Sequence, residues 1–154
     1  NQLTGIDGGV FANNPTMAAI AEIKKFGQWD YYKKKDNTKV AFDDLRVLSL
    51  GTGSYIGTIS EKDAVSWGQL QWAQNIPNIM MKGVNQSTHY ESNEIMDHGK
   101  YLRLDIVIKD EEYSVMTDAR KTTREYLEAE VKSQITENPI MLDLLTKFIQ
   151  GIEM

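Results

Sequence analysis

The chain contains no cysteine among its 154 residues. Disulfides, thiolate zinc sites and cysteine nucleophiles are therefore excluded within it. No apolar run approaches the roughly 20 residues that a membrane-spanning helix needs, and no signal-peptide pattern is visible. Because a lack of cysteine fits a reducing compartment, we expect a cytoplasmic protein that contacts membranes only peripherally and transiently.

Positive charge is also in short supply. The 17 lysines and arginines are outnumbered by 22 aspartates and glutamates, which gives a formal net charge of -5. An acidic surface repels phosphate backbones, so nucleic acid is not an expected partner. Hydrophobic residues make up 41% of the chain, which is ordinary for a globular protein and sufficient for the core of one domain.

Two asparagine–proline pairs are the clearest helix signals. Asparagine is a favoured N-cap, and proline fits the first helical position because its missing N–H would be unpaired there. Asn14-Pro15 therefore predicts a helix that runs to about Phe26, and Asn138-Pro139 predicts one that ends at Gly151.

The segments between these helices alternate between strand and helix patterns. We predict strands over Leu45–Leu50 and Tyr101–Ile108. Between them, Ser60–Ile95 is predicted to be mostly helical, with a capping box at Ser60 and Asp63 and a start, kink or break of the helix at Pro77. A further helix is predicted to be capped by Thr117 or Asp118. This alternation predicts an α/β layer structure with a mainly parallel sheet. Two clear strands are too few for a complete sheet, so we expect further strands before Asn1.

A glycine-rich turn lies close to the start of the chain, in Gly5-Ile6-Asp7-Gly8-Gly9-Val10. Aspartate readily bonds its own turn, and glycine reaches backbone angles that strain other residues, so such a motif is usually only a turn. A functional role would need the Asp7 carboxylate to be held beside a nucleophile. The helix that begins at Asn14-Pro15 would favour negative charge nearby.

The wider series of motifs changes this assessment. Asp7-Gly8-Gly9-Val10 is followed by Asn13-Asn14-Pro15, a helix, a strand ending in Leu48-Ser49-Leu50-Gly51-Thr52-Gly53, and Trp67-Gly68 with Trp72. In this order the motifs resemble the patatin-like phospholipase family. The resemblance is most specific from Asp7 to Pro15 and from Val47 to Gly53, and it continues more loosely to Ile108.

The resemblance implies a three-layer α/β fold with a mainly parallel central sheet, of which residues 1–154 form the C-terminal part of a single domain. It implies a serine–aspartate dyad in which Asp7 is the base and Gly8 and Gly9 form its turn. The serine of such a dyad lies in a Gly-x-Ser-x-Gly elbow downstream of a glycine-rich oxyanion loop. Neither motif occurs in this chain, so we expect both before Asn1, on the N-terminal part of the same protein.

The implied activity is hydrolysis of glycerophospholipids or other acyl-ester lipids through an acyl-enzyme. A serine needs a base within hydrogen-bond reach to become a nucleophile, and this chemistry needs no metal or organic cofactor. The isolated chain is expected to be inactive. The alternative within the same fold is a non-catalytic lipid-binding or scaffold relative.

A second alternative is nucleotide binding by the Gly51-Thr52-Gly53-Ser54 loop, since a glycine-rich loop after a strand can cradle a phosphate. The spacing to Gly57 misses the usual Gly-x-Gly-x-x-Gly pattern. The resemblance implies instead that these glycines let the strand end pass close beneath the active site.

Other polar and aromatic groups have more ordinary interpretations. His89 and His98 lie near several carboxylates but would point to opposite sides of one helix, so we expect a polar helix face and no metal site. The basic run Lys33–Asn37 is expected to be an exposed loop. Packing or an acyl-chain groove could explain a set of large side chains, namely Trp67, Trp72, Met80, Met81 and the tyrosines Tyr31, Tyr32, Tyr90 and Tyr101.

Overall fold

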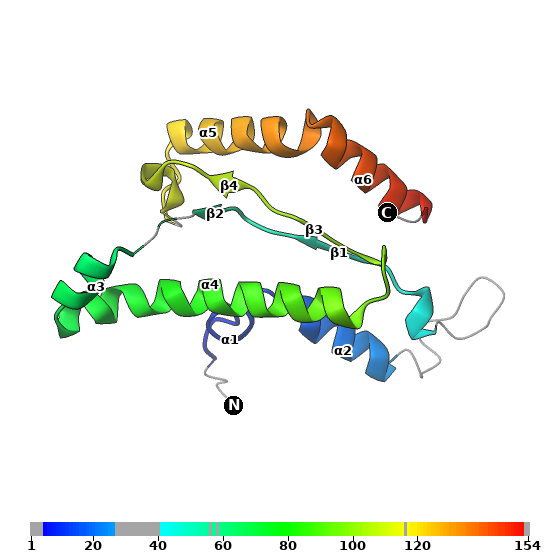
Figure 1. Ribbon diagram of the computed structural model, residues 1–154, viewed down its shortest axis with the longest axis horizontal. Helices are drawn as coiled ribbons and strands as arrows, with labels where there is room; N and C mark the ends of the chain where they lie inside the picture. Colours follow the sequence, from blue (N-terminus) through cyan, green and yellow to red (C-terminus); the bar gives the residue numbers. More distant parts are fainter. Residues whose placement is uncertain (1–4, 27–40, 56, 58, 116, 153–154) are drawn as a thin grey trace. The chain divides into compact units, whose positions relative to one another are not determined.

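The computed structural model describes residues 5–26, 41–55, 57, 59–115 and 117–152. The chain divides into two compact units (Figure 1), one made of residues 1–47 and 65–97 and the other of residues 48–64 and 98–154. The predicted loop Lys33–Asn37 and the tyrosines Tyr31 and Tyr32 lie outside the described residues. Within the described part of the chain, no helix combines the length and the apolar character that crossing a bilayer requires.

The first unit is helical. It contains the short helix α1 (Gly9–Ala12), α2 (Thr16–Phe26), the 3-10 turn η1 (Phe42–Asp44) and the long helix α4 (Gln69–Ile95). Both α1 and α2 pack against α4. Its buried side chains include Ile20 of α2, the small residues Thr88 and Ser92 of α4, and Met96 just after α4. The segment that carries Asp7 is therefore anchored on one long helix.

The predicted helix after Asn14-Pro15 is confirmed as α2. The Asn14 carboxamide oxygen accepts the backbone N–H of Thr16 at 3.2 Å and its hydroxyl at 2.6 Å. Asn14 is only 5% exposed, so this cap lies in the interior of the unit. A capping side chain of this kind contributes about 1 kcal/mol to helix stability.

The Ser60–Ile95 segment is helical, as predicted, but in two helices. Helix α3 (Glu61–Ser66), which contains the boundary between the units, begins where the backbone N–H of Asp63 donates to the Ser60 hydroxyl at 3.1 Å. This confirms the cap. Of the alternatives predicted at Pro77, a start or a break is wrong, because Pro77 lies inside the 27-residue α4, and a kink there stays a prediction. Proline removes a single donor, and the turns on either side continue the helix.

The second unit combines strands and helices. Strand β1 (Val47–Leu50) pairs with β3 (Tyr101–Leu104), and β2 (Ser54–Tyr55) pairs in parallel with β4 (Val107–Ile108). The 3-10 turn η2 (Glu111–Ser114), helix α5 (Lys121–Val131), the π-helical segment η3 (Lys132–Thr136) and helix α6 (Pro139–Gln150) follow. Helix α5 packs on β4. The buried apolar side chains of this unit are Tyr101, Leu104, Ile106, Ile108 and Phe148.

The α/β class is confirmed, whereas the three-layer arrangement stays a prediction. The strand predicted over Tyr101–Ile108 is in fact β3 and β4, interrupted at Asp105 and Ile106. At the interruption, Asp105 turns its carboxylate toward the loop after β1, where it accepts the backbone N–H of Gly53. Backbone bonds from Gly51 to Leu104 and from Ser54 to Ile106 continue the pairing on either side of it.

The two predicted C-terminal helices are confirmed, with one shift at a boundary. Asn138 caps α6 by accepting the N–H groups of Ile140 at 3.0 Å and Met141 at 3.3 Å. Gly151 ends the helix with a φ of 77°, an angle that favours glycine. Helix α5 begins later than predicted, with Arg120 and not Thr117 or Asp118 at the N-cap.

Candidate functional site

Asp7 lies on a hydrogen-bonded turn at the start of α1. The backbone N–H of Gly9 donates to Asp7 Oδ1 at 2.7 Å, and the N–H of Val10 donates to the Asp7 carbonyl at 3.1 Å. The side chain is exposed. Among the residues that the structure describes, none donates to Oδ2. One oxygen of the carboxylate is thus fixed by its own backbone, and the other can accept a proton from outside the turn.

The two glycines after Asp7 lie in ordinary backbone regions. Gly8 is helical, with φ of −59° and ψ of −24°, and neither Gly8 nor Gly9 has a positive φ. The turn leads directly into α1. Space explains Gly9, since a Cβ there would lie 3.0 Å from Asp7 Oδ1. At Gly8 an added Cβ would meet no atom within 4 Å.

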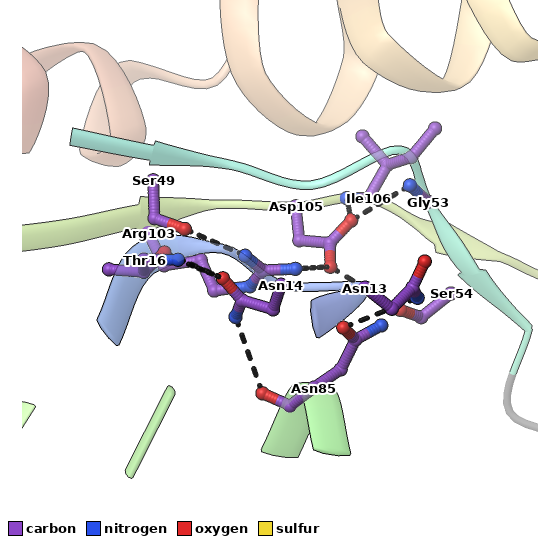
Figure 2. A network of polar contacts seen from close by, with 10 residues as sticks. All are labelled: Asn13, Asn14, Thr16, Ser49, Gly53, Ser54, Asn85, Arg103, Asp105 and Ile106. Carbon is purple, nitrogen blue, oxygen red and sulfur yellow. Dashed lines mark hydrogen bonds and ion pairs between the residues drawn. The ribbon is translucent and has the colours of Figure 1, made fainter. Parts of the chain in front are cut away.

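Asn13 and Asn14 connect the end of the Asp7 turn to α4 (Figure 2). The Asn13 amide donates to the side-chain oxygen of Asn85 at 3.4 Å, and the Asn14 amide donates to the Asn85 carbonyl at 3.5 Å. The Asn13 side-chain oxygen lies 3.6 Å from the position of a Cβ on Gly9. Asn85, a residue that the sequence analysis missed, therefore contacts both asparagines that follow the turn.

The second unit holds a separate polar cluster around Asp105, also drawn in Figure 2. Asp105 Oδ1 accepts the backbone N–H of Gly53 at 2.9 Å and that of Ile106 at 3.0 Å. Its Oδ2 accepts the Ser54 hydroxyl at 3.3 Å and pairs with Arg103 at 3.0 Å. Both oxygens of the carboxylate are therefore bonded within the unit.

The Asp105 cluster accounts for the glycines of the Gly51-Thr52-Gly53 loop. A Cβ on Gly51 would overlap the Asp105 carboxylate, so only glycine lets that group reach the loop. Gly53 has a φ of 100°, which other residues adopt only with strain. The N–H that a phosphate would need at Gly53 is already bonded to a carboxylate. The Asp105 carboxylate thus supplies the negative charge that binds this loop, and no described contact favours nucleotide binding there.

Arg103 joins this cluster to β1. Its guanidinium donates to the Ser49 hydroxyl at 2.8 Å as well as to Asp105, and its side chain is only 13% exposed. Burial raises the pKa of the neighbouring Tyr101, and the hydrogen bond to Ser49 and the charge of Arg103 offset part of that rise. The tyrosine stays neutral near pH 7, which suits its place in the core.

The histidines do not share one helix, contrary to the expectation. Helix α4 ends at Ile95, so it includes His89 but not His98. Within the described ranges, no group of three or more histidine, aspartate or glutamate side chains is arranged to hold a metal ion.

Several of the large side chains pack together, but others face solvent. Trp67 and Trp72 form an edge-to-face pair with ring centroids 5.1 Å apart, and Tyr101 is in the core. Met80 and Tyr90 are exposed at 62% and 66%. Packing therefore explains some of this set and not all of it.

The chain is similar to plant proteins named patatin-like. It is 30% identical over 155 residues to patatin-like protein 1 of Arabidopsis thaliana, a match that covers 92% of this chain and 37% of that protein. Patatin-like protein 3 of the same species is 31% identical over 115 residues, which is 65% of this chain and 26% of that protein. Patatin-like protein 1 of Oryza sativa subsp. indica is 40% identical over 76 residues, or 46% of this chain and 18% of that protein. No family model and no solved structure matches the chain.

Proposed function

Because this chain belongs to the family of patatin-like proteins, we propose that it is the part of a lipid acyl hydrolase that carries the catalytic base. The base is Asp7. The matched region spans about a third of the relative in the first comparison, at 37% of its length, so the proposal places the nucleophilic serine and the oxyanion loop on a segment outside these 154 residues. The substrates are glycerophospholipids or other acyl-ester lipids.

The observation that carries this proposal is the state of the Asp7 carboxylate. Gly9 holds Oδ1 at 2.7 Å, which fixes the direction of the group. Among the described residues none donates to Oδ2, and the side chain is exposed. A general base needs a fixed position and a free lone pair within reach of the proton that it takes. The Asp105 carboxylate, with both oxygens bonded, has no such lone pair to spare.

The proposed mechanism uses Asp7 as a general base and general acid in turn. As the serine oxygen attacks the acyl carbonyl carbon, its proton passes to Asp7 Oδ2, and backbone N–H groups outside the chain stabilise the oxyanion. The tetrahedral intermediate collapses to an acyl-enzyme, and the protonated Asp7 returns the proton to the leaving alcohol. Asp7 then takes a proton from the water that attacks the acyl-enzyme, and it returns this proton to the serine oxygen as the fatty acid leaves. Protons and oxygens balance over the cycle without a metal or organic cofactor.

The proposal places the enzyme in the cytoplasm, where it reaches lipid by transient contact with a membrane surface. The net charge of -5 disfavours lasting electrostatic attachment to anionic lipid. The lack of cysteine is compatible with a reducing compartment.

Hydrolysis of a short-chain acyl ester by the intact protein tests the function. We expect the wild type to turn the ester over and Asp7→Asn to lose activity by at least about 100-fold, because asparagine keeps the oxygen that Gly9 binds but is not basic. Asp143→Asn, which changes an exposed aspartate of α6 paired with Lys147, is the matched control and should retain activity. A correctly folded wild type without turnover would favour the non-catalytic relative.

A further inference from the structure

We propose that Asn85, in the middle of α4, is a positioning residue for Asp7 and acts on it through Asn13. This inference rests on the proposed function, since it assigns a role within the same site. It concerns contacts inside the first unit alone. Asn85 touches neither substrate nor the reacting atoms in this account.

The first step is the anchoring of the Asp7 turn. The segment from Asp7 to Asn14 consists of the turn and the four-residue α1, and its apolar side chains Ile6, Val10 and Phe11 are 85%, 75% and 88% exposed. Within the described residues, these side chains therefore draw little from apolar packing. Side-chain hydrogen bonds from Asn13 and Asn14 join the end of this segment to α4.

The second step is the route from Asn85 to the carboxylate. The side-chain oxygen of Asn85 accepts the Asn13 amide at 3.4 Å. The Asn13 side-chain oxygen lies 3.6 Å from the position that a Cβ on Gly9 would take, so this bond holds Asn13 near Gly9 at the end of the turn. Gly9 in turn donates its N–H to Asp7 Oδ1. Displacement of Asn13 would loosen α1 around the residue that orients the carboxylate.

The third step separates Asn85 from Asn14. The Asn14 amide binds the backbone carbonyl of Asn85 at 3.5 Å, a contact that any residue at position 85 can provide. The Asn14 oxygen is already bonded to Thr16. Among the described residues, the bond that the Asn85 side chain makes is to Asn13, so substitutions at 85 test this link and should leave the start of α2 intact.

The test uses the intact protein and three variants at or near this link. Asn85→Ala removes the acceptor, Asn85→Asp keeps it, and Asn78→Ala changes an exposed asparagine of the same helix as a matched control. We expect Asn85→Ala to lower kcat about 10-fold with KM unchanged, because a misplaced catalytic group slows the chemical step more than binding. Asn85→Asp should recover most of the rate, and Asn78→Ala should match the wild type.

A double-mutant cycle checks the route. Asn13→Ala should have the same effect as Asn85→Ala, and the double variant should lose no more than either single variant. If kcat in the double variant falls by the product of the two single-variant losses, the route through Asn13 is overturned. Wild-type kcat in Asn85→Ala, alongside lost activity in Asp7→Asn, would overturn the inference and leave the proposed function standing.

Hydrogen exchange at the Gly9 amide tests, independently of activity, whether Asn85 holds the Asp7 turn. The exchange rate should rise several-fold in Asn85→Ala and not in Asn78→Ala, since the bond to Asp7 would open more often. If the wild type has no esterase activity, the proposed function fails, and an unchanged Gly9 rate would then also overturn the role of Asn85 in holding the turn.

Discussion

The carboxylate of Asp105 accepts the backbone N–H of Gly53 at 2.9 Å, although 52 positions separate the two residues. The bond joins the end of β3 to the loop after β1 and gives this glycine-rich loop an anion from its own chain. The loop that most resembles a nucleotide-binding motif is thereby explained as part of the fold of the second unit.

Removal of the Asp105 carboxylate should destabilise the protein strongly. Asp105→Ala would leave the N–H groups of Gly53 and Ile106 unbonded and Arg103, at 13% exposure, without its ion pair. The pair is partly buried, so the loss of these bonds should cost about 1–3 kcal/mol. Thermal unfolding of the intact protein should show the loss. Asp143→Ala, which breaks an exposed i,i+4 pair on α6, should cost less than about 0.5 kcal/mol, and equal effects would contradict the account.

Two glycine-to-alanine substitutions should have opposite effects on stability. Gly51→Ala would place a methyl group against the Asp105 carboxylate and should cost about 2 kcal/mol through overpacking. Gly83→Ala, inside α4 with no atom within 4 Å of the new Cβ, should stabilise by up to about 1 kcal/mol because alanine favours the helix. Chemical denaturation of both variants measures the difference. A neutral Gly51→Ala would mean that the loop does not need this close approach.

The stabilising effect of Asp118 should depend on pH. Hydrogen bonds from the Arg120 side chain, the Thr123 hydroxyl and the Arg120 backbone hold the pKa of Asp118 far below its ordinary value. A carboxylate whose folded-state pKa is depressed contributes stability above its unfolded pKa of about 4, and that contribution is lost as the pH falls through the folded value.

Asp118→Asn should therefore lower the Tm by a few degrees at neutral pH, and the difference from wild type should shrink as the pH falls below about 4. Thermal melts over this range measure it. A difference that stays constant with pH would show that charge on Asp118 plays no part in holding Arg120 and Thr123.

Local signals in the sequence predicted the local elements of the fold. The Asn14-Pro15 and Asn138-Pro139 pairs gave the starts of α2 and α6 because a cap depends only on residues two or three positions away. The Ser60 cap of α3 was predicted for the same reason. At α5 the predicted Asp118 lies two positions before the N-cap, where it accepts the backbone N–H of Arg120 and the hydroxyl of Thr123 in the first turn.

The features that the sequence did not predict depend on contacts between residues far apart in the chain. The predicted strand is interrupted at Asp105, which bonds to Gly53, and nothing within the segment Tyr101–Ile108 specifies that partner. An aspartate directly before the β-branched stretch Ile106–Ile108 was the one local hint, since aspartate is rare in strands. Asn85 carried no signal, because its contact with Asn13 spans 72 positions. Asp7 itself was found through the order of motifs around it, and its role as the base stays a prediction.

The most direct test of that role is labelling of the intact protein with a fluorescent alkyl phosphonate, which reacts only with an activated serine. Wild type and Asp7→Asn would be compared at equal folded concentration, established by their thermal transitions. The account predicts that the wild type labels and that Asp7→Asn loses most of the signal, since the serine then lacks its base. Equal labelling of both proteins, or labelling of neither, would contradict the assignment of Asp7 as the catalytic base.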